Sequence, residues 1–198
     1  MNFNITPQKK KKILKSEEKK DVNDIDDSEL LEEHFDRIGR SVFMFDDITG
    51  PSAMRVMKAL TILDRTEGDI KLIINSEGGS TIDGWGIVDF ITQMKNPVHG
   101  LVYGGAFSMA SVILQACKTR CMTKHSTMLV HAGSIETTSD TNSAILNAEF
   151  LKKDLEITMD FYRSRAKISP KKMKELMSQD SFIDAQEALK YGLIDKII

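Results

Sequence analysis

The sequence is poor in the residues that define several protein classes. Its 198 residues include two cysteines, Cys117 and Cys121, which lie four positions apart. A disulfide framework is therefore excluded, and a reducing, cytoplasmic location is expected. No apolar run approaches the roughly 20 residues that a membrane-spanning helix needs. Neither sign of charge is in excess, since 27 Lys and Arg against 29 Asp and Glu give a net charge of −2. This balance provides no general attraction for nucleic acid or an acidic membrane.

Residues 1–33 have no glycine and a single aromatic side chain, but they contain seven lysines and nine acidic residues. Such a composition cannot bury enough apolar surface to offset the entropy of ordering, so a flexible segment is expected there. The run Lys9–Lys12 could contact nucleic acid, but the acidic residues that follow favour a solvated charge run. A short helix is expected at Asp24–Arg37, and residues 34–198 are expected to form one folded domain.

The rest of the chain alternates between strand and helix patterns. Strands are expected at Ser41–Phe45, Ile70–Asn75, Pro97–Tyr103 and Thr127–His131. Helices are expected at Pro51–Leu63, Gly84–Met94, Ser108–Cys117 and 142–167, after Ser169, and between Asp184 and Gly192. The continuous apolar run Ile70–Asn75 is typical of a strand covered on both faces. The alternation predicts a single α/β domain with parallel strands and right-handed crossovers.

Glycine is concentrated where the chemistry is expected. All 12 glycines follow residue 38, and seven lie in one 28-residue window, 78–105. In Asn75–Ser80, two adjacent glycines stand between a strand and a helix, where backbone N–H groups can face a ligand. The alternative is a tight turn. The segment is not a P-loop, because the Lys and Ser/Thr that follow the last glycine of that motif are missing.

A serine and a histidine each follow a predicted strand. Ser108 opens a helix of small residues, which resembles a nucleophile elbow, although a simple helix cap is the alternative. His131 ends an apolar strand and is suited to act as the base that a serine nucleophile needs. A carboxylate would orient that histidine, but spacing alone does not choose among several candidates. These are Asp140, Asp154, Asp160, Asp180 and Asp184.

Metal chemistry has weaker support in the sequence. Cys117, Cys121 and His125 are spaced by four residues, which fits no standard zinc signature. A metal site is therefore not expected. The 11 methionines are most simply core residues.

Four motifs in order resemble the proteolytic subunits of the Clp protease (ClpP), over about residues 40–197. The family's I-N-S-P-G-G-S corresponds to Ile74–Ser80, its G-Q-A-A-S-M to Gly104–Met109, and its strand ending in His to Leu129–His131. Its carboxyl-terminal motif, R-D-x-F-x-x-A-x-E-A-x-x-Y-G-L-x-D, corresponds to Gln179–Asp195. The resemblance implies an α/β fold, the ClpP/crotonase-like spiral of repeated ββα units, with a long helix at about 142–167.

The resemblance also implies roles for individual residues. Ser108 would be the nucleophile, His131 the general base and Asp180 the residue that orients it. The backbone N–H groups of Gly79 and Met109 would form the oxyanion hole. The implied activity is endopeptidase cleavage through an acyl-enzyme, with no cofactor or metal in this subunit.

The resemblance extends to assembly. It implies a homo-oligomer, a seven-membered ring and possibly a double ring of fourteen, whose internal chamber is fed by an AAA+ unfoldase that uses ATP. Protein or peptide substrates would be the other partners, and the apolar face of the helix at 142–167 could join two rings.

Two positions and one segment depart from the family's pattern. Glu77 stands where the family has Pro, Phe107 is bulkier than the usual Ala, and 132–137 replaces a Gln-Pro and glycine-rich strand. These changes are expected to alter the substrate groove and ring contacts rather than the catalytic residues.

Four other functions are compatible with parts of the pattern. A capsid-maturation protease of phage and a non-catalytic ring subunit share the fold. A crotonase-like acyl-CoA enzyme would use the paired N–H groups without a Ser–His pair. A Ser–Lys protease would require Lys118 or Lys124 beside Ser108.

Overall fold

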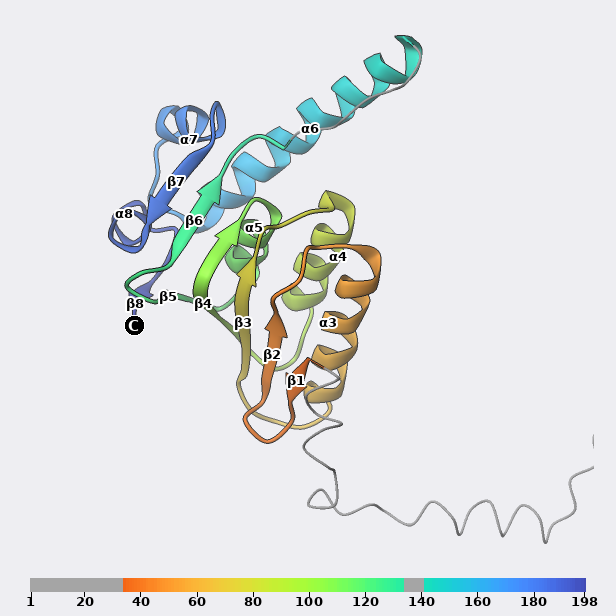
Figure 1. Cartoon of the computed structure of the whole chain (residues 1–198), viewed down its shortest axis with the longest axis vertical. Helices are drawn as coiled ribbons and strands as arrows, with labels where there is room; N and C mark the ends of the chain where they lie inside the picture. Colours follow the sequence, from red (N-terminus) through yellow and green to blue (C-terminus); the bar gives the residue numbers. More distant parts are fainter. Residues whose placement is uncertain (1–33, 134–140) are drawn as a thin grey trace, which may run out of the picture. The chain divides into compact units, whose positions relative to one another are not determined.

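The computed structural model describes residues 34–133 and 141–198, which contain eight strands and six helices (Figure 1). The expected flexible segment at 1–33 lies outside the described residues, as does most of the helix expected at Asp24–Arg37. The described end of that helix is wrong, because Phe35–Asp36 forms strand β1. None of the helices in the described ranges combines the length and hydropathy needed to cross a bilayer.

The described strands form one sheet with the order β1-β2-β3-β4-β5-β8. Strands β2 to β5 and β8 run parallel to one another. Strand β4 is the longest, and it pairs with β5 along its first half and with β6 along its second half. The strands after β1 are β2 (Ser41–Met44), β3 (Ile70–Ser76), β4 (Val98–Phe107), β5 (Thr119–Met122), β6 (Thr127–Val130), β7 (Ser181–Asp184) and β8 (Lys196–Ile197).

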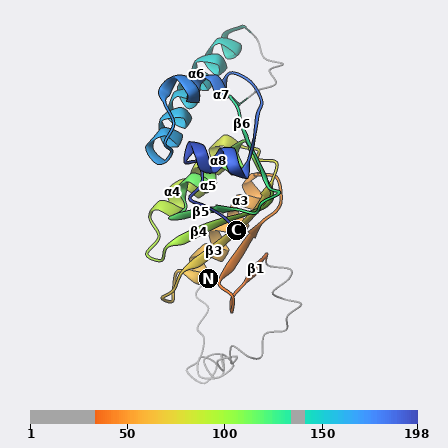
Figure 2. The same cartoon turned by 90° about the vertical axis from the view of Figure 1, so that its left-hand side faces the viewer.

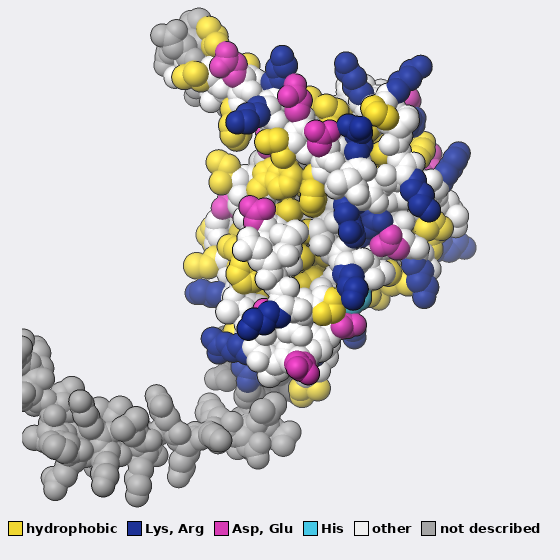
Figure 3. Space-filling model, turned by 180° about the vertical axis from the view of Figure 1, so that it is seen from behind, with side chains coloured by type: hydrophobic (Ala, Val, Ile, Leu, Met, Phe, Trp, Pro, Cys, Tyr) yellow, Lys and Arg dark blue, Asp and Glu magenta, His cyan; other side chains and the backbone are white. Residues whose placement is uncertain are grey.

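The helices fall into two groups, which Figures 1 and 2 show from two directions. Helices α3, α4 and α5 pack side by side along the sheet, whereas α6 and α7 pack together beyond β6. Seen from the far side, hydrophobic side chains gather where α6 leaves the sheet (Figure 3). The helices are α3 (Gly50–Leu63), α4 (Thr81–Thr92), α5 (Met109–Ala116), α6 (Thr141–Arg165), α7 (Pro170–Met177) and α8 (Ala185–Tyr191).

The sequence explains where several helices begin and end. Thr49 and Ser52 form a reciprocal capping box before α3, and Pro51 stands in its first turn. Ser169 accepts a hydrogen bond from Lys172 N–H and so caps α7 as expected. Gly192 ends α8 with a φ of 69°, a left-handed conformation that favours glycine. Each of these expected boundaries is confirmed.

Two expectations about the sheet are wrong in part. The β1–β2 and β6–β7 pairs are antiparallel, so the sheet is mixed. Strand β3 is not buried on both faces: Ile70, Leu72 and Ile74 are fully buried, but Lys71 and Asn75 on the opposite face are exposed. The helices cover one face of this strand, so burial alternates with the period of two that strands impose. The α/β fold with one long helix is confirmed.

An ion pair between a buried arginine and a partly exposed aspartate ties β5 to the carboxyl-terminal end of the domain. Arg120 is 4% exposed, and its guanidinium donates to both carboxylate oxygens of Asp195, at 3.1 Å from Nε and 2.6 Å from Nη2. The N–H of Arg120 donates to the same carboxylate, and Nη1 donates to Gln115. Partial burial acts to raise the pKa of Asp195, but hydrogen bonds and charge from Arg120 outweigh it and lower the pKa.

Replacing Asp195 by Ala is expected to lower the free energy of unfolding at pH 7 by about 3 kcal/mol, because the guanidinium would stay buried without its counter-charge. When folding lowers the pKa of a carboxylate, the ionised group stabilises the folded state at pH values above its pKa in the unfolded chain. This contribution is lost as the pH falls through the pKa of the folded state. The deficit should therefore shrink below about pH 4. Urea unfolding of the variant and the wild type at several pH values measures this difference in unfolding free energy. The control is Asp160→Ala, which breaks an exposed ion pair with Arg163. An undiminished deficit in acid would contradict this explanation.

Candidate active site

Ser108 stands at a strained turn between β4 and α5. Its φ of 51° and ψ of −125° are unusual for a residue with a side chain. Its N–H donates to Leu129 O at 3.0 Å, which fixes the turn against β6. Ser108 occupies the cap position of α5, yet its side chain makes no capping hydrogen bond. The helix-cap alternative therefore does not describe this serine, and the turn has the geometry of a nucleophile elbow.

The side chain of Ser108 instead meets His131 and, through it, Asp180. The Oγ of Ser108 lies 2.9 Å from Nε2 of His131. The other ring nitrogen, Nδ1, lies 3.0 Å from Oδ1 of Asp180. The His131 side chain is 22% exposed and the Asp180 side chain 68% exposed. The three side chains thus form a continuous hydrogen-bonded chain in the order that a serine nucleophile, its base and the orienting carboxylate require.

The five candidate carboxylates differ in the groups that they contact. Asp154 accepts from Trp85, Asp160 pairs with Arg163, and Asp184 caps α8. Asp180 contacts His131, and Asp140 lies outside the described residues. The antiparallel β6–β7 pair explains this choice, because it pairs Val130 with Ser181 and so places their neighbours side by side.

The double-glycine turn packs directly on the elbow. A Cβ at Gly78 would lie 2.5 Å from Phe107 O and 2.8 Å from the Cβ of Ser108, so only glycine fits this approach. Gly78 O and Ser80 N–H both bond to Ile48 on one side. In such a parallel bridge the N–H of the central residue, Gly79, points away from Ile48. The segment is therefore a tight turn packed on the elbow, and it leaves the Gly79 N–H free of the bridge to Ile48.

Met109 supplies a second N–H at this place. It is the first residue of α5, where a backbone N–H has no acceptor within the helix. Its N–H follows directly on the nucleophile, and its nitrogen would lie 3.0 Å from a Cβ at Gly78. A backbone N–H without a helical acceptor, that of Met109, therefore stands beside Ser108, and Gly78 packs against both residues.

A buried hydroxyl pair supports the elbow from behind. Ser111, one turn along α5, donates to Ser108 O at 2.6 Å and lies 3.0 Å from Leu129 O. Its Oγ is also hydrogen-bonded to the hydroxyl of Tyr162, which α6 provides. Both side chains are almost fully buried, and burial raises the pKa of Tyr162. The helical spacing of α6 predicts burial at 162 but not this partner, although a buried tyrosine usually finds one.

Replacing Tyr162 by Phe is expected to lower the free energy of unfolding by about 1 kcal/mol, since one buried hydrogen bond is lost while the ring still packs. Peptide hydrolysis should fall several-fold in kcat with little change in KM, because the support of the elbow is weakened. Tyr191→Phe, which removes a hydroxyl elsewhere in the domain, serves as the control. An unchanged unfolding free energy and kcat would show that the pair is not needed.

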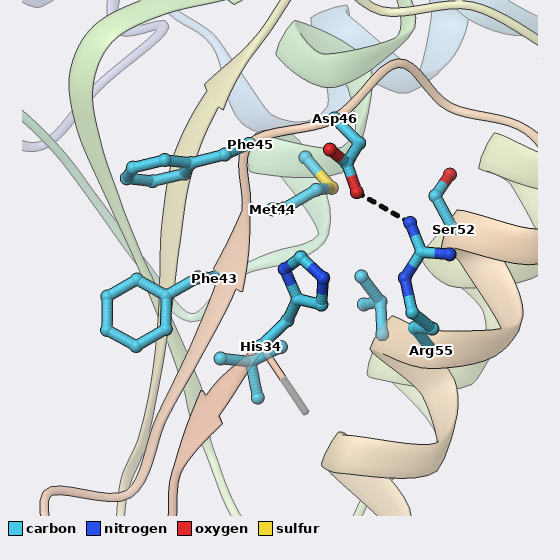
Figure 4. Close-up of a pocket in the computed structure, with 9 residues that line it drawn as sticks. His34, Phe43, Met44, Phe45, Asp46, Ser52 and Arg55 are labelled. Atoms are coloured by element: carbon cyan, nitrogen blue, oxygen red, sulfur yellow. Dashed lines mark hydrogen bonds and ion pairs between the residues drawn. The ribbon is translucent and has the colours of Figure 1, made fainter. Parts of the chain in front are cut away.

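Two cavities differ in what they can hold. One of about 190 Å³ lies beside His131 and is lined by the segment 131–133, Met177 and one face of α6. The other lies between β2 and α3, where Figure 4 shows the His34 ring between the strand and Arg55. Asp46 and Arg55 form an ion pair of 2.6 Å at its edge. Its volume of about 10 Å³ admits no more than one water molecule. Of these two cavities, the one beside His131 is large enough for a substrate side chain.

The described residues also bear on the metal and Ser–Lys alternatives. No group of three or more His, Cys, Asp or Glu side chains within residues 34–133 and 141–198 could hold a metal. Burial raises the pKa of Cys117 to about 12, which disfavours the thiolate that binds metal. Lys118 follows the far end of α5, about 12 Å along the helix from Ser108. A Ser–Lys pair with Lys118 is therefore not formed.

Comparison with known proteins gives a consistent result. The family model described as Clp protease matches residues 27–198. The ATP-dependent Clp protease proteolytic subunit of Deinococcus radiodurans is 31% identical over 163 residues, which are 80% of each chain. The proteolytic subunit 1 of Chlamydia muridarum is 32% identical over 185 residues, 89% of this chain and 92% of the relative. The proteolytic subunit 2 of a Synechococcus species is 32% identical over 166 residues, 80% and 83% of the two chains.

Proposed function

The chain belongs to the Clp protease family, and from this premise we propose that Ser108, His131 and Asp180 are the catalytic triad of a peptidase. Family membership makes the chain a serine endopeptidase of the Clp type. The observation that carries the assignment of residues is the hydrogen-bonded chain from Ser108 Oγ through His131 to Asp180, at 2.9 and 3.0 Å.

Acylation begins when Ser108 Oγ attacks the carbonyl carbon of a peptide bond. His131 Nε2 takes the hydroxyl proton, and Asp180 accepts from Nδ1–H, which fixes the tautomer and stabilises the imidazolium. The carbonyl oxygen becomes an oxyanion that accepts hydrogen bonds from Gly79 and Met109 N–H. Each such donor contributes about 3 kcal/mol to lowering the barrier.

Collapse of the tetrahedral intermediate breaks the C–N bond. His131 gives its proton to the leaving amine, and the acyl group remains as an ester on Ser108. A water molecule then attacks the ester carbonyl while His131 takes one of its protons. The second intermediate releases the carboxylic acid product, and His131 returns the proton to Ser108. No metal or cofactor takes part in these steps.

The relatives are named proteolytic subunits of an ATP-dependent protease, which supports a further proposal about assembly. The chain would form a homo-oligomeric ring, with seven subunits per ring and a chamber that a partner ATPase feeds. Helix α6 supports contact between copies, because large apolar side chains stand 48–65% exposed along it. These are Ile145, Leu146, Phe150 and Ile157.

Native mass spectrometry of the full chain, combined with hydrolysis of a fluorogenic peptide, tests both parts. The expected result is an assembly of seven or fourteen copies that cleaves the peptide without ATP. A stable monomer with no peptidase activity would contradict the proposal. Hydrolysis of acyl-CoA that survives His131→Ala would favour the crotonase-like alternative instead.

A further inference from the structure

The cavity beside His131 contains a carboxylate that the catalytic steps do not use. Four residues of α6 line this cavity at the spacing of one helix face: Leu151, Asp154, Leu155 and Thr158. Asp154 is partly buried and Thr158 is 8% exposed. An ionised side chain on the buried side of a helix is costly unless it meets a partner. A cationic group close to Asp154 would therefore offset the cost of its partly buried negative charge.

Asp154 is held in place but not neutralised. Its Oδ1 accepts from Nε1 of Trp85 at 3.0 Å, and Trp85 packs edge-to-face on Phe161 at 5.3 Å. This neutral bond fixes the rotamer and uses one oxygen. None of the ion pairs formed within 34–133 and 141–198 includes Asp154. The carboxylate is thus oriented at the cavity with its charge available.

Lys152 also lines the cavity, but it does not occupy the same position as Asp154. It is exposed and lies off the helix face that Leu151, Leu155 and Thr158 share. A long lysine stem covers apolar surface while its ammonium group stays in water. Lys152 therefore forms part of the rim, and the inner wall of the cavity carries the negative charge.

We propose that this cavity receives the side chain of the residue whose carbonyl Ser108 attacks, and that Asp154 selects Lys or Arg there. The inference rests on the proposed peptidase function. The volume of about 190 Å³ equals roughly six water molecules, enough for one long side chain. Leu151, Leu155 and Ala132 would contact its methylene groups. Asp154 would accept a charge-assisted hydrogen bond from the cationic end, and the Thr158 hydroxyl offers a second acceptor.

Two coumarin-amide peptides that differ only in Lys or norleucine before the coumarin test this selection in the full chain. The two side chains have the same four-carbon length, so the ratio of their kcat/KM values reports the charge. The wild type is expected to prefer Lys at least tenfold. Asp154→Asn keeps an oxygen for Trp85 but loses the charge, so it should lower the ratio at least tenfold. Asp160→Asn, on the same helix and exposed, should leave the ratio unchanged.

The outcomes separate the inference from the proposed function. A wild type that cleaves norleucine as well as Lys, or an Asp154→Asn variant with an unchanged ratio, would overturn the role of Asp154 while the peptidase stands. Should neither peptide be cleaved and Ser108 not react with a fluorophosphonate, the peptidase function itself fails. Thr158→Val provides a second variant if Asp154→Asn does not fold, and it should also lower the ratio for Lys.

Discussion

Replacement of Ser108 by Ala is expected to lower peptide hydrolysis by about 10⁵- to 10⁶-fold, because no other group supplies the nucleophile. The two proposed backbone donors, Gly79 and Met109, remain in this variant, as does the cavity beside His131, so KM should change little. The steady-state rate with a fluorogenic peptide measures the loss. Substrate should be in excess and the variant free of wild-type protein, since a trace of wild type would dominate the residual rate.

The structure also predicts that this variant keeps its fold. Ser108 holds the turn through its backbone N–H, and its side chain makes no capping hydrogen bond. The unfolding free energy of Ser108→Ala should therefore stay within about 0.5 kcal/mol of the wild type. Ser164→Ala is the matched control, since Ser164 is exposed and bonds only to Phe161 O within its own helix. Its rate should equal that of the wild type. Substantial hydrolysis by Ser108→Ala would mean that another group is the nucleophile.

Replacement of Asp180 by Asn is expected to lower kcat by about 10³-fold, because an amide permits the wrong imidazole tautomer and cannot stabilise the imidazolium. A fully buried triad carboxylate is associated with a loss of about 10⁴-fold. The smaller value follows from the 68% exposure of Asp180, since water can replace part of its effect. Single-turnover acylation with an activated peptide ester measures the chemical step directly.

The Asp184→Asn variant tests whether the loss of kcat in Asp180→Asn is specific to Asp180 or follows from removing any nearby negative charge. Asp184 lies four residues along the same segment and accepts the N–H of Glu187 as the cap of α8, a role that Asn also fills. It should retain the wild-type rate. Equal activity in Asp180→Asn and the wild type would remove Asp180 from the triad and leave Ser108 and His131 as a dyad.

Local sequence patterns predicted the parts of the fold that short-range physics controls. Helix boundaries near Pro51 and at Ser169 and Gly192 follow from a first-turn proline, a capping group and a left-handed turn, which depend on neighbouring residues alone. The short strands β5, β7 and β8 were not predicted, because their pairing depends on distant partners. The antiparallel β6–β7 pair is of this kind, and it joins residues about 50 positions apart.

The same distinction holds for the candidate site. The strand-to-helix turn at Ser108 and the glycine pair at 78–79 are local features, and the sequence identifies both. The choice of Asp180 among five carboxylates required either the family resemblance or the β6–β7 pairing. The partners of Asp154 and Tyr162 could not be predicted, since Trp85 and Ser111 lie 69 and 51 residues away. A half-buried acid in an otherwise apolar helix face is the pattern that could have indicated Asp154.

The central claim is that Ser108 is the nucleophile of a serine peptidase, and covalent labelling tests it most directly. The assembled full-length chain is treated with a fluorophosphonate, and the adduct is located by intact-mass measurement and peptide mapping. One adduct per subunit on Ser108, absent from Ser108→Ala and retained in Ser164→Ala, is the predicted result. An assembled protein that takes up no label, or that takes it up on another residue, would contradict the claim.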